Sequence, residues 1–154
     1  TLALVSGADF INDKNLEEEI FGPFSLFVEC ENMNQLKSVI KQINGQLTGT
    51  ILATNNEMLM NKDLIDILKE RVGRVIFNGV PTGVEVSPSM LHGGPYPAST
   101  DSRFTAVGIK SIDRWVRPLS YQDFPNELLP DSLKNNNPKN ILRLVNGVYT
   151  KNKI

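Results

Sequence analysis

The sequence predicts an α/β fold in which parallel strands alternate with helices. Strand-like and helix-like segments follow one another between Phe24 and Asn78. The expected strands are rich in β-branched residues, and the expected helices carry apolar residues at helical spacing. This alternation is typical of parallel strands joined by right-handed crossovers, whose functional loops gather beyond the carboxyl ends of the strands.

Four stretches have the composition of strands. They are Thr1–Val5, Phe24–Glu29, Thr48–Thr54 and Arg74–Asn78. A first helix is expected to begin at Asn32, with Gln35 at the capping-box position, and to end at Asn44-Gly45. A second helix is expected to start after Asn55 or Asn56 and to be closed by Gly73. Its apolar stripe comprises Leu64, Ile65, Ile67, Leu68 and Val72.

The second half of the chain is less regular. A loop rich in glycine and proline runs from about Gly79 to Arg103, and a loop of this length is usually functional. Phe104–Ile109 is expected to form a short helix. Residues 115–121 are expected to be extended, and Pro118 limits them to an edge strand.

The C-terminal residues predict a linker followed by a hairpin. Pro125–Lys139 is rich in Asn and Pro, whereas Ile141–Tyr149 is apolar and contains the turn signal Asn146-Gly147.

Composition limits the classes of function. The chain has 16 basic and 17 acidic residues, so charge gives no reason to expect nucleic acid or an anionic membrane as a partner. The single cysteine, Cys30, excludes an internal disulfide and fits a reducing cytoplasm. No apolar stretch is long enough to span a bilayer. The strand-like opening without an initial Met indicates a start inside a longer protein, a processed N-terminus being the alternative.

The stretch Glu19-Ile20-Phe21-Gly22-Pro23 is the first candidate for chemistry. A carboxylate accepts hydrogen bonds from the two hydroxyls of a ribose, and a phenyl ring two residues on can lie against a nicotinamide. The alternative is a polar turn with Phe21 in the core, and the residues alone favour this alternative. The neighbouring Glu17 and Glu18 are expected to form a solvated face.

Five motifs in order resemble the aldehyde dehydrogenase superfamily, over about Thr1 to Tyr121. They are Glu19–Pro23, Leu47–Thr54, Gly73–Asn78, Ser87-Pro88 with His92-Gly93-Gly94, and Ser102-Arg103 with the segment up to Ile109. The amino-acid sequence of residues 79–121 is most similar to that of the α-ketoglutaric semialdehyde dehydrogenase group. The resemblance implies that residues 1–121 are the C-terminal part of the catalytic domain, a mostly parallel sheet flanked by helices, with the start of the intersubunit strand. Residues 122–154 are then a linker and tail.

The resemblance also implies a mechanism. A cysteine thiolate attacks the aldehyde, hydride passes to NAD or NADP, and water activated by a carboxylate hydrolyses the thioester. Glu19 matches the glutamate that holds the nicotinamide ribose, and Phe21 matches the phenylalanine beside the nicotinamide. The nucleophile, the general base and the Rossmann site of the family lie upstream of Glu19, and Cys30 is no substitute for the nucleophile. The 154 residues alone are therefore expected to be inactive.

His92, the only histidine, matches a position that lines the family's substrate pocket, where an imidazole could tune the thiolate or hold a polar end of the substrate. A loop histidine bonded to backbone is an equal alternative. Met90 and Leu91, with Val84 and Val86, are expected either to line the aldehyde pocket or to be buried in the core.

Two further residues are expected to have structural roles near the site. Asn78 matches an asparagine that braces the active-site loops. Arg103 has the chemistry of a ligand for a substrate carboxylate, but its family position favours a structural ion pair. No metal site is expected, because a lone histidine without clustered cysteines or carboxylates is a poor one.

The sequence thus predicts part of an NAD(P)-dependent aldehyde dehydrogenase that oxidises an aldehyde, such as 2,5-dioxopentanoate, to a carboxylate. We expect a cytoplasmic homo-oligomer. A non-catalytic interaction module with the same fold is the alternative.

Overall fold

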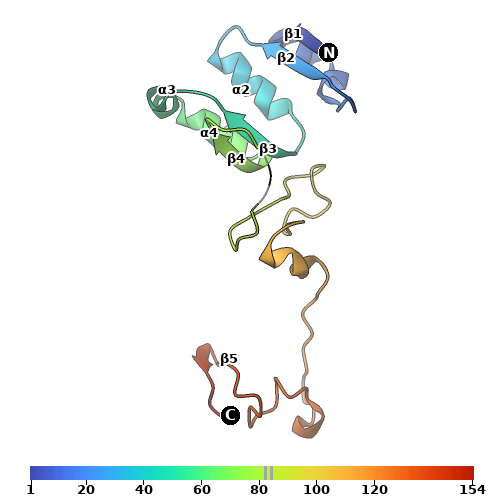
Figure 1. Cartoon of the computed structure of the whole chain (residues 1–154), viewed down its shortest axis with the longest axis vertical. Coiled ribbons are helices and arrows are strands. Elements are labelled where there is room, and N and C mark those ends of the chain that lie inside the picture. The colour runs from blue at the N-terminus through green and yellow to red at the C-terminus, as the bar shows by residue number, and fades with distance from the viewer. Residues whose placement is uncertain (82, 84) are drawn as a thin grey trace. The chain divides into compact units, whose positions relative to one another are not determined.

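The computed structural model describes residues 1–81, 83 and 85–154 (Figure 1). The chain divides into two compact units, Thr1–Val116 and Arg117–Ile154. The first unit contains both parallel pairs of strands and every residue singled out above as a candidate site residue.

The first pair of strands is β1, Leu2–Ser6, and β2, Ser25–Glu29, which run parallel. The connection contains α1, Gly7–Asn12, and a 3-10 helix η1, Lys14–Glu17. The Ser6 hydroxyl caps α1 by accepting a hydrogen bond from the Asp9 N–H at 3.0 Å. Phe10 of α1 is only 5% exposed, so this helix anchors the connection above the strands.

The second pair is β3, Gln46–Ile51, and β4, Val72–Phe77, which also run parallel. The helix α2, Met33–Gln42, leads from β2 to β3. Its predicted N-cap is confirmed, because Asn32 Oδ1 accepts a hydrogen bond from the Gln35 N–H at 3.0 Å. The Gln35 side chain accepts from the Glu31 N–H and not from that of Asn32, so the reciprocal bond of the capping box is shifted by one residue.

The expected second helix is two helices, α3, Asn55–Met60, and α4, Lys62–Lys69. The cap of α3 is Thr54 rather than Asn55 or Asn56, because Thr54 and Glu57 form a complete capping box. Asn61 has a non-helical backbone and separates the two helices. Placing Val72 in the helix was wrong: it is the first residue of β4, where its β-branched side chain is buried.

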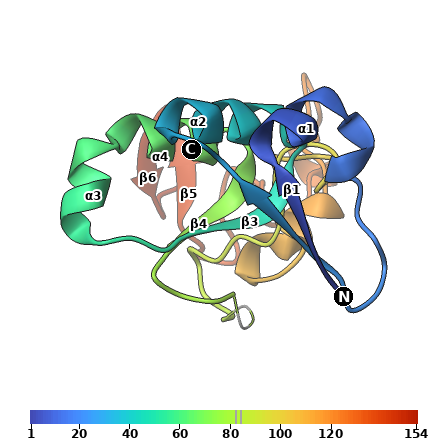
Figure 2. The ribbon, with the colours of Figure 1, turned by 90° about the horizontal axis from the view of Figure 1, so that it is seen from above.

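The predicted α/β class with parallel strands flanked by helices is confirmed, although the described strands form separate two-stranded sheets. The helix α2 packs against both α1, which belongs with the first pair of strands, and α4, which belongs with the second. Seen from above, α1, α2 and α4 lie on the same side of the strands β1 to β4 (Figure 2).

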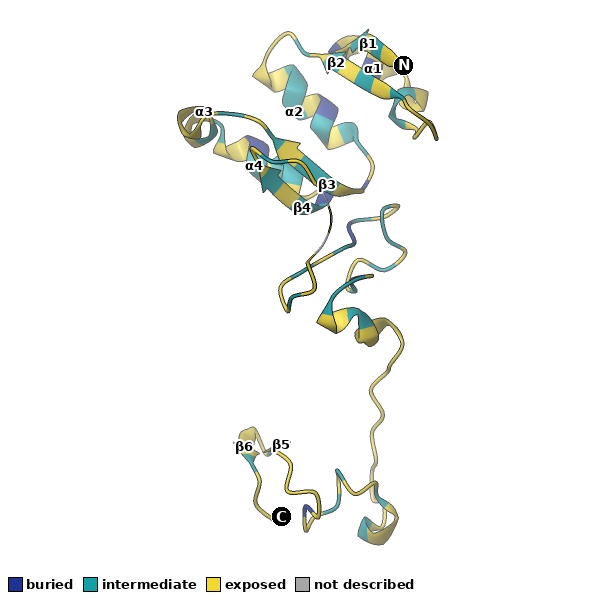
Figure 3. Ribbon diagram, in the orientation of Figure 1, coloured by how far each residue is buried: buried dark blue, intermediate teal, exposed yellow. Residues whose placement is uncertain are grey.

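The core of the first unit is small. Its buried apolar side chains are Phe10, Val39, Leu64 and Val72. Large apolar residues remain exposed on β1 and β2, including Leu2, Leu4 and Phe27, so that burial is concentrated between the helices and the strands (Figure 3). Exposed apolar surface of this kind indicates an interaction surface rather than a surface that faces solvent.

The helix expected at Phe104–Ile109 was wrong, because the 3-10 helix η2 lies later, at Ile109–Arg114. The buried Thr105 hydroxyl accepts hydrogen bonds from the N–H groups of His92 and Val107 and donates to the Val107 carbonyl. These bonds to the Thr105 hydroxyl replace the helical ones, and Gly108 at φ 99° stops any continuation. Residues 115–121, expected to be extended, pair with no strand in the part of the chain that the structure covers.

The second unit is organised around two polar side chains. Its strands β5, Arg143–Val145, and β6, Val148–Thr150, form the predicted hairpin, with Asn146 and Gly147 at positive φ. Asn137 donates from Nδ2 to the carbonyls of Ile141 and Lys151 at 2.9 Å, and the Arg143 guanidinium donates to the Lys134 carbonyl at 2.7 Å. A short 3-10 helix η3, Asn126–Leu128, precedes these contacts.

No helix among the residues that the structure describes has the length and apolarity needed to cross a membrane.

Candidate functional site

Glu19 and Phe21 lie between η1 and β2, with their side chains on the surface. Phe21 is 94% exposed, so it is not part of the core that the residues of this chain form. The Glu19 carboxylate accepts no hydrogen bond from any residue that the structure describes. The two residues share a hollow of about 530 Å³ with Phe10, Leu16 and Val39. The Glu19 carboxylate, without a hydrogen-bond donor among the described residues, and the solvent-exposed Phe21 ring thus lie two residues apart on the surface.

Glu17 holds this stretch against the turn that precedes β3. Its side chain is half-buried, and its Oε2 accepts a hydrogen bond from the Asn44 N–H at 3.2 Å. The expectation of a solvated face was therefore wrong for Glu17, because the Asn44 N–H, beyond the end of α2, donates a hydrogen bond to its carboxylate. Glu18 is exposed, as expected.

The same turn also holds the loop that follows His92. The Gly45 N–H donates to the Tyr96 carbonyl at 3.2 Å. A Cβ at Gly45 would lie 2.0 Å from the Pro95 carbonyl oxygen, and one at Gly94 would lie 2.4 Å from that of Gln46. Only glycine fits at these two points. One turn therefore joins the Glu19 stretch to the His92 loop.

His92 sits in that loop with its backbone fully engaged. Its N–H donates to the Thr105 hydroxyl at 2.8 Å, and its carbonyl accepts from the Ala106 N–H at 2.9 Å. The half-buried side chain lines a hollow of about 300 Å³. Leu47 and Ala98 line both this hollow and a larger one beside Glu19, of about 780 Å³, so the two candidate regions are adjacent.

Arg103 forms an ion pair with Asp101. Arg103 Nε donates to Asp101 Oδ1 at 3.0 Å, and an η nitrogen donates to Oδ2 at 2.6 Å. The hydrogen bonds from the Arg103 side chain and backbone lower the pKa of the Asp101 carboxyl to about 2. The fork of Arg103 is thus already occupied by a carboxylate of the chain itself.

Asn78 braces the carboxyl ends of β3 and β4. Its Oδ1 accepts from the Ala53 N–H at 2.9 Å, its Nδ2 donates to the Ala53 carbonyl at 2.8 Å, and its own N–H donates to the Ile51 carbonyl. Its backbone has φ 49°, which turns the chain away from the strand.

The other expected pocket residues lie elsewhere. Met90 is half-buried, with its sulfur 3.7 Å from an Arg74 donor, and Leu91 is 37% exposed. Neither lines the hollow beside His92. Val86 is exposed, and Val84 lies outside the described residues.

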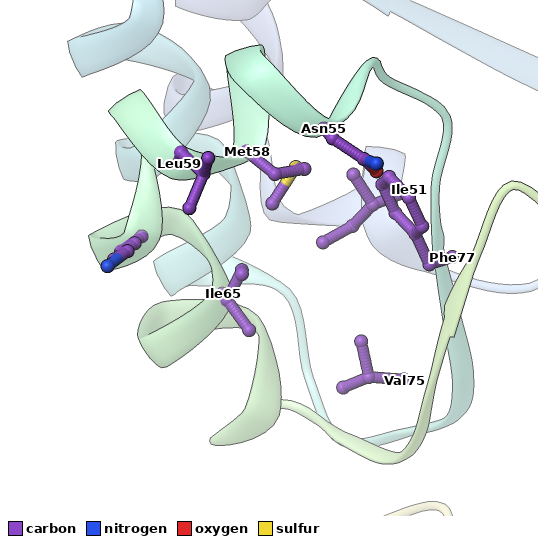
Figure 4. Close-up of a pocket in the computed structure, with 8 residues that line it drawn as sticks. Ile51, Asn55, Met58, Leu59, Ile65, Val75 and Phe77 are labelled. Carbon is purple, nitrogen blue, oxygen red and sulfur yellow. The ribbon is translucent and has the colours of Figure 1, made fainter.

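A further hollow, of about 500 Å³, lies between α3, α4 and the strands β3 and β4. Apolar side chains such as Met58, Ile65 and Phe77 face it (Figure 4). Lys62 is its only charged lining residue, so this hollow has the character of a packing surface. No group of three His, Cys, Asp or Glu side chains placed to hold a metal ion occurs in residues 1–81, 83 and 85–154.

Sequence reasoning missed three residues that build the site. Glu17 was assigned to solvent, Thr105 to a helix, and Arg114, which also lines the His92 hollow, was not singled out. Only the proximity of Glu17 to the Asn44 N–H could have revealed the first, and no local signal indicates this contact between residues far apart in the sequence.

No protein-family model matches the chain. The chain is 48% identical over 137 residues, 89% of its length, to an α-ketoglutaric semialdehyde dehydrogenase of Acinetobacter baylyi, of which it covers 26%. It is 40% identical over 143 residues, 93% of its length, to α-ketoglutaric semialdehyde dehydrogenase 2 of Azospirillum brasilense, of which it covers 27%. Both matches are longer than residues 1–121, so the similarity extends past Tyr121, further than the motifs indicated. The resemblance inferred from the motifs is confirmed: nearly the whole chain is related to α-ketoglutaric semialdehyde dehydrogenases, and it spans about a quarter of the length of these relatives.

Proposed function

We propose that this chain is the segment of an NAD(P)-dependent aldehyde dehydrogenase that positions the nicotinamide end of the cofactor and carries the loop beside the substrate. The substrate is α-ketoglutaric semialdehyde (2,5-dioxopentanoate), which is oxidised to the carboxylate. The observation that carries the proposal is the pairing of an unengaged Glu19 carboxylate with a bare Phe21 ring, in a chain 48% identical to such an enzyme.

The residues present fit the cofactor. An ionised carboxylate only accepts hydrogen bonds, and Glu19 is free to accept those of the ribose hydroxyls. Phe21 offers an exposed flat face to the nicotinamide. When bound, the nicotinamide takes up the hydride released by the substrate. Glu19 and Phe21 orient this group and exclude water from it, and neither forms or breaks a bond.

Cys30 is not the nucleophile in this proposal. Burial raises the pKa of its thiol, which lowers the fraction of reactive thiolate at neutral pH. It lies where β2 leads into α2 and lines neither the Glu19 nor the His92 hollow. The attacking cysteine, the general base and the dinucleotide site belong to the remaining length found in the relatives, so the 154 residues alone do not reduce NAD(P)+.

A chimera tests the proposal. The 137 matched residues replace their counterpart in the Acinetobacter baylyi relative, and NAD(P)+ reduction is followed with 2,5-dioxopentanoate. We expect an active chimera in which Glu19→Gln lowers kcat/KM for the cofactor about 10- to 100-fold, the range for losing charge-assisted hydrogen bonds. Glu18→Gln is the matched control. A soluble chimera with the relative's oligomeric state that reduces no NAD(P)+ would contradict the proposal.

The exposed apolar side chains favour a second candidate, a non-catalytic interaction module. Leu2, Leu4 and Phe27 leave an apolar face on the first pair of strands. In our proposal such faces are covered in a cytoplasmic homo-oligomer. Light scattering of the chain does not separate the two candidates by itself, because both predict association. The chimera separates them, because an interaction module without catalytic function predicts an inactive chimera. A monodisperse monomer at high concentration argues against association in either case.

A further inference from the structure

We propose that Arg114 and the hollow beside His92 form a carboxylate-binding subsite, which holds the acid end of the substrate while the aldehyde end faces the catalytic centre. This inference rests on the proposed function and deepens it by assigning the residue that recognises the charged part of the substrate.

The hollow has the size and lining for a small polar ligand. Its volume, about 300 Å³, is at the lower end of the range for ligand pockets. Ser99 and Thr100 supply hydroxyls, His92 an imidazole and Arg114 a guanidinium. The Ser99 oxygen accepts a hydrogen bond from the Gly94 N–H at 3.1 Å, which leaves its own proton to donate to a ligand.

The charges in the hollow leave one cation uncompensated. Asp101 also lines it, but its carboxylate is paired with Arg103 through a two-point fork. The Arg114 side chain makes no ion pair or hydrogen bond with any residue whose placement the structure gives. The sequence suggested Arg103 as a carboxylate ligand, but its guanidinium is already paired with Asp101. Arg114 is the arginine in this hollow whose N–H donors are available to a ligand.

Trp115 orients the Arg114 side chain. The guanidinium carbon lies 5.9 Å from the centroid of the Trp115 ring, over its face. A cation–π contact of this kind uses none of the guanidinium N–H donors in hydrogen bonds, so they remain able to bind a carboxylate at two points.

The substrate named for the two relatives indicates which chemical groups the ligand has. An α-ketoglutaric semialdehyde has a carboxylate beside a keto group at one end and an aldehyde at the other. A site that pairs with a substrate's polar group rejects analogues lacking that group far more strongly than an apolar pocket does. A single arginine in this hollow is therefore sufficient to favour acidic aldehydes over neutral ones.

Fluorescence of the intact 154-residue chain tests the subsite without requiring catalysis. Trp115 is the only tryptophan, and the centroid of its ring lies 5.9 Å from the guanidinium carbon of Arg114. The probe is glutarate, a five-carbon dicarboxylate, with glutaramide as its uncharged counterpart at equal ionic strength. We expect a saturable change with a dissociation constant on the order of 1 mM for glutarate and none for glutaramide.

Three variants complete the test. Arg114→Gln is expected to weaken glutarate binding at least about tenfold, and Arg114→Lys, which keeps the charge but loses the fork, to give an intermediate loss. Arg117→Gln, which removes a guanidinium three residues later and outside the hollow, is expected to bind as the unchanged chain does. If Arg114→Gln is not folded by circular dichroism, the comparison of Arg114→Lys with the unchanged chain decides.

An unsaturable response, or equal responses to glutarate with and without the Arg114 guanidinium, overturns the subsite. This binding assay is independent of the chimera. An inactive chimera with intact glutarate binding refutes the proposed dehydrogenase and leaves a carboxylate site, whereas an active chimera with no glutarate binding refutes the subsite alone.

Discussion

The side-chain amide of Asn78 makes both hydrogen bonds of a β-bridge with the backbone of Ala53, at 2.9 Å and 2.8 Å. The ladder between β3 and β4 ends at Ile51 and Phe77, so Asn78 extends the pairing with its side chain while its main chain leaves the sheet at φ 49°. The loop that carries His92 therefore departs from a point held by both strands.

Two substitutions of Asn78 should separate the contribution of its side-chain amide to stability from that of its left-handed backbone. Asn78→Gly loses two side-chain hydrogen bonds but tolerates positive φ, so we expect a loss of about 1–2 kcal/mol in unfolding free energy. Asn78→Ala loses the same bonds and adds the strain of a left-handed alanine, about 1 kcal/mol more. Urea unfolding of both variants measures the difference. Equal stabilities of the two would show that the left-handed backbone costs nothing there.

Glu17 should act on the cofactor only through its hydrogen bond to Asn44. Glu17→Ala frees the Asn44 N–H, so its hydrogen exchange should accelerate and, in the active chimera, KM for the cofactor should rise about three- to tenfold with kcat little changed. Glu17→Gln keeps an acceptor oxygen and should restore both values. Glu18→Ala, at an exposed neighbour, is the control. A defect in Glu17→Gln equal to that in Glu17→Ala would assign the effect to charge instead.

The Asp101–Arg103 pair should make stability depend on acid pH. The pKa of Asp101 is lowered from 3.8 to about 2 in the folded chain, so its contribution is fully present above the ordinary pKa. That contribution is lost as pH falls through the interval from 3.8 to about 2. Arg103→Gln should return the Asp101 pKa toward 3.8, measured by NMR titration of the carboxyl carbon. An unchanged Asp101 titration in this variant would mean that the pair does not form in solution.

Arg114 should set the preference for acidic aldehydes in the active chimera. Arg114→Gln is expected to lower kcat/KM for 2,5-dioxopentanoate about 10- to 100-fold and to leave that for pentanal within about twofold. The ratio of the two substrates is the readout, because a general structural defect lowers both together. A parallel fall for both aldehydes would remove the substrate role of Arg114.

Local sequence signals were sufficient for the cap of α2 and for the C-terminal hairpin, where the stabilising contact is close along the chain. Asn32 caps α2 from three residues before Gln35, and Asn146-Gly147 forms the β5–β6 turn with its own backbone at positive φ. The resemblance carried by Glu19 to Pro23 was also local, and the relatives confirmed it. These features depend on residues a few positions apart, which a sequence displays directly.

Local signals failed where a distant partner decides. Val72 fits a helical stripe, but pairing with Gln46 makes it the start of β4. Phe104–Ile109 was expected to be a short helix, but the Thr105 hydroxyl accepts a hydrogen bond from the His92 N–H. In each case a contact made across the fold outweighed a local preference of a few tenths of a kcal/mol per residue.

The sequence by itself determined the α/β class, the helix cap, the hairpin turn and the relationship to semialdehyde dehydrogenases, since each is written in short motifs. Tertiary structure alone decided that Glu17 holds the Asn44 turn and that Arg114 shares a hollow with His92. The physical reason is that hydrogen bonds and charges act through space, and only folding determines which of them are neighbours.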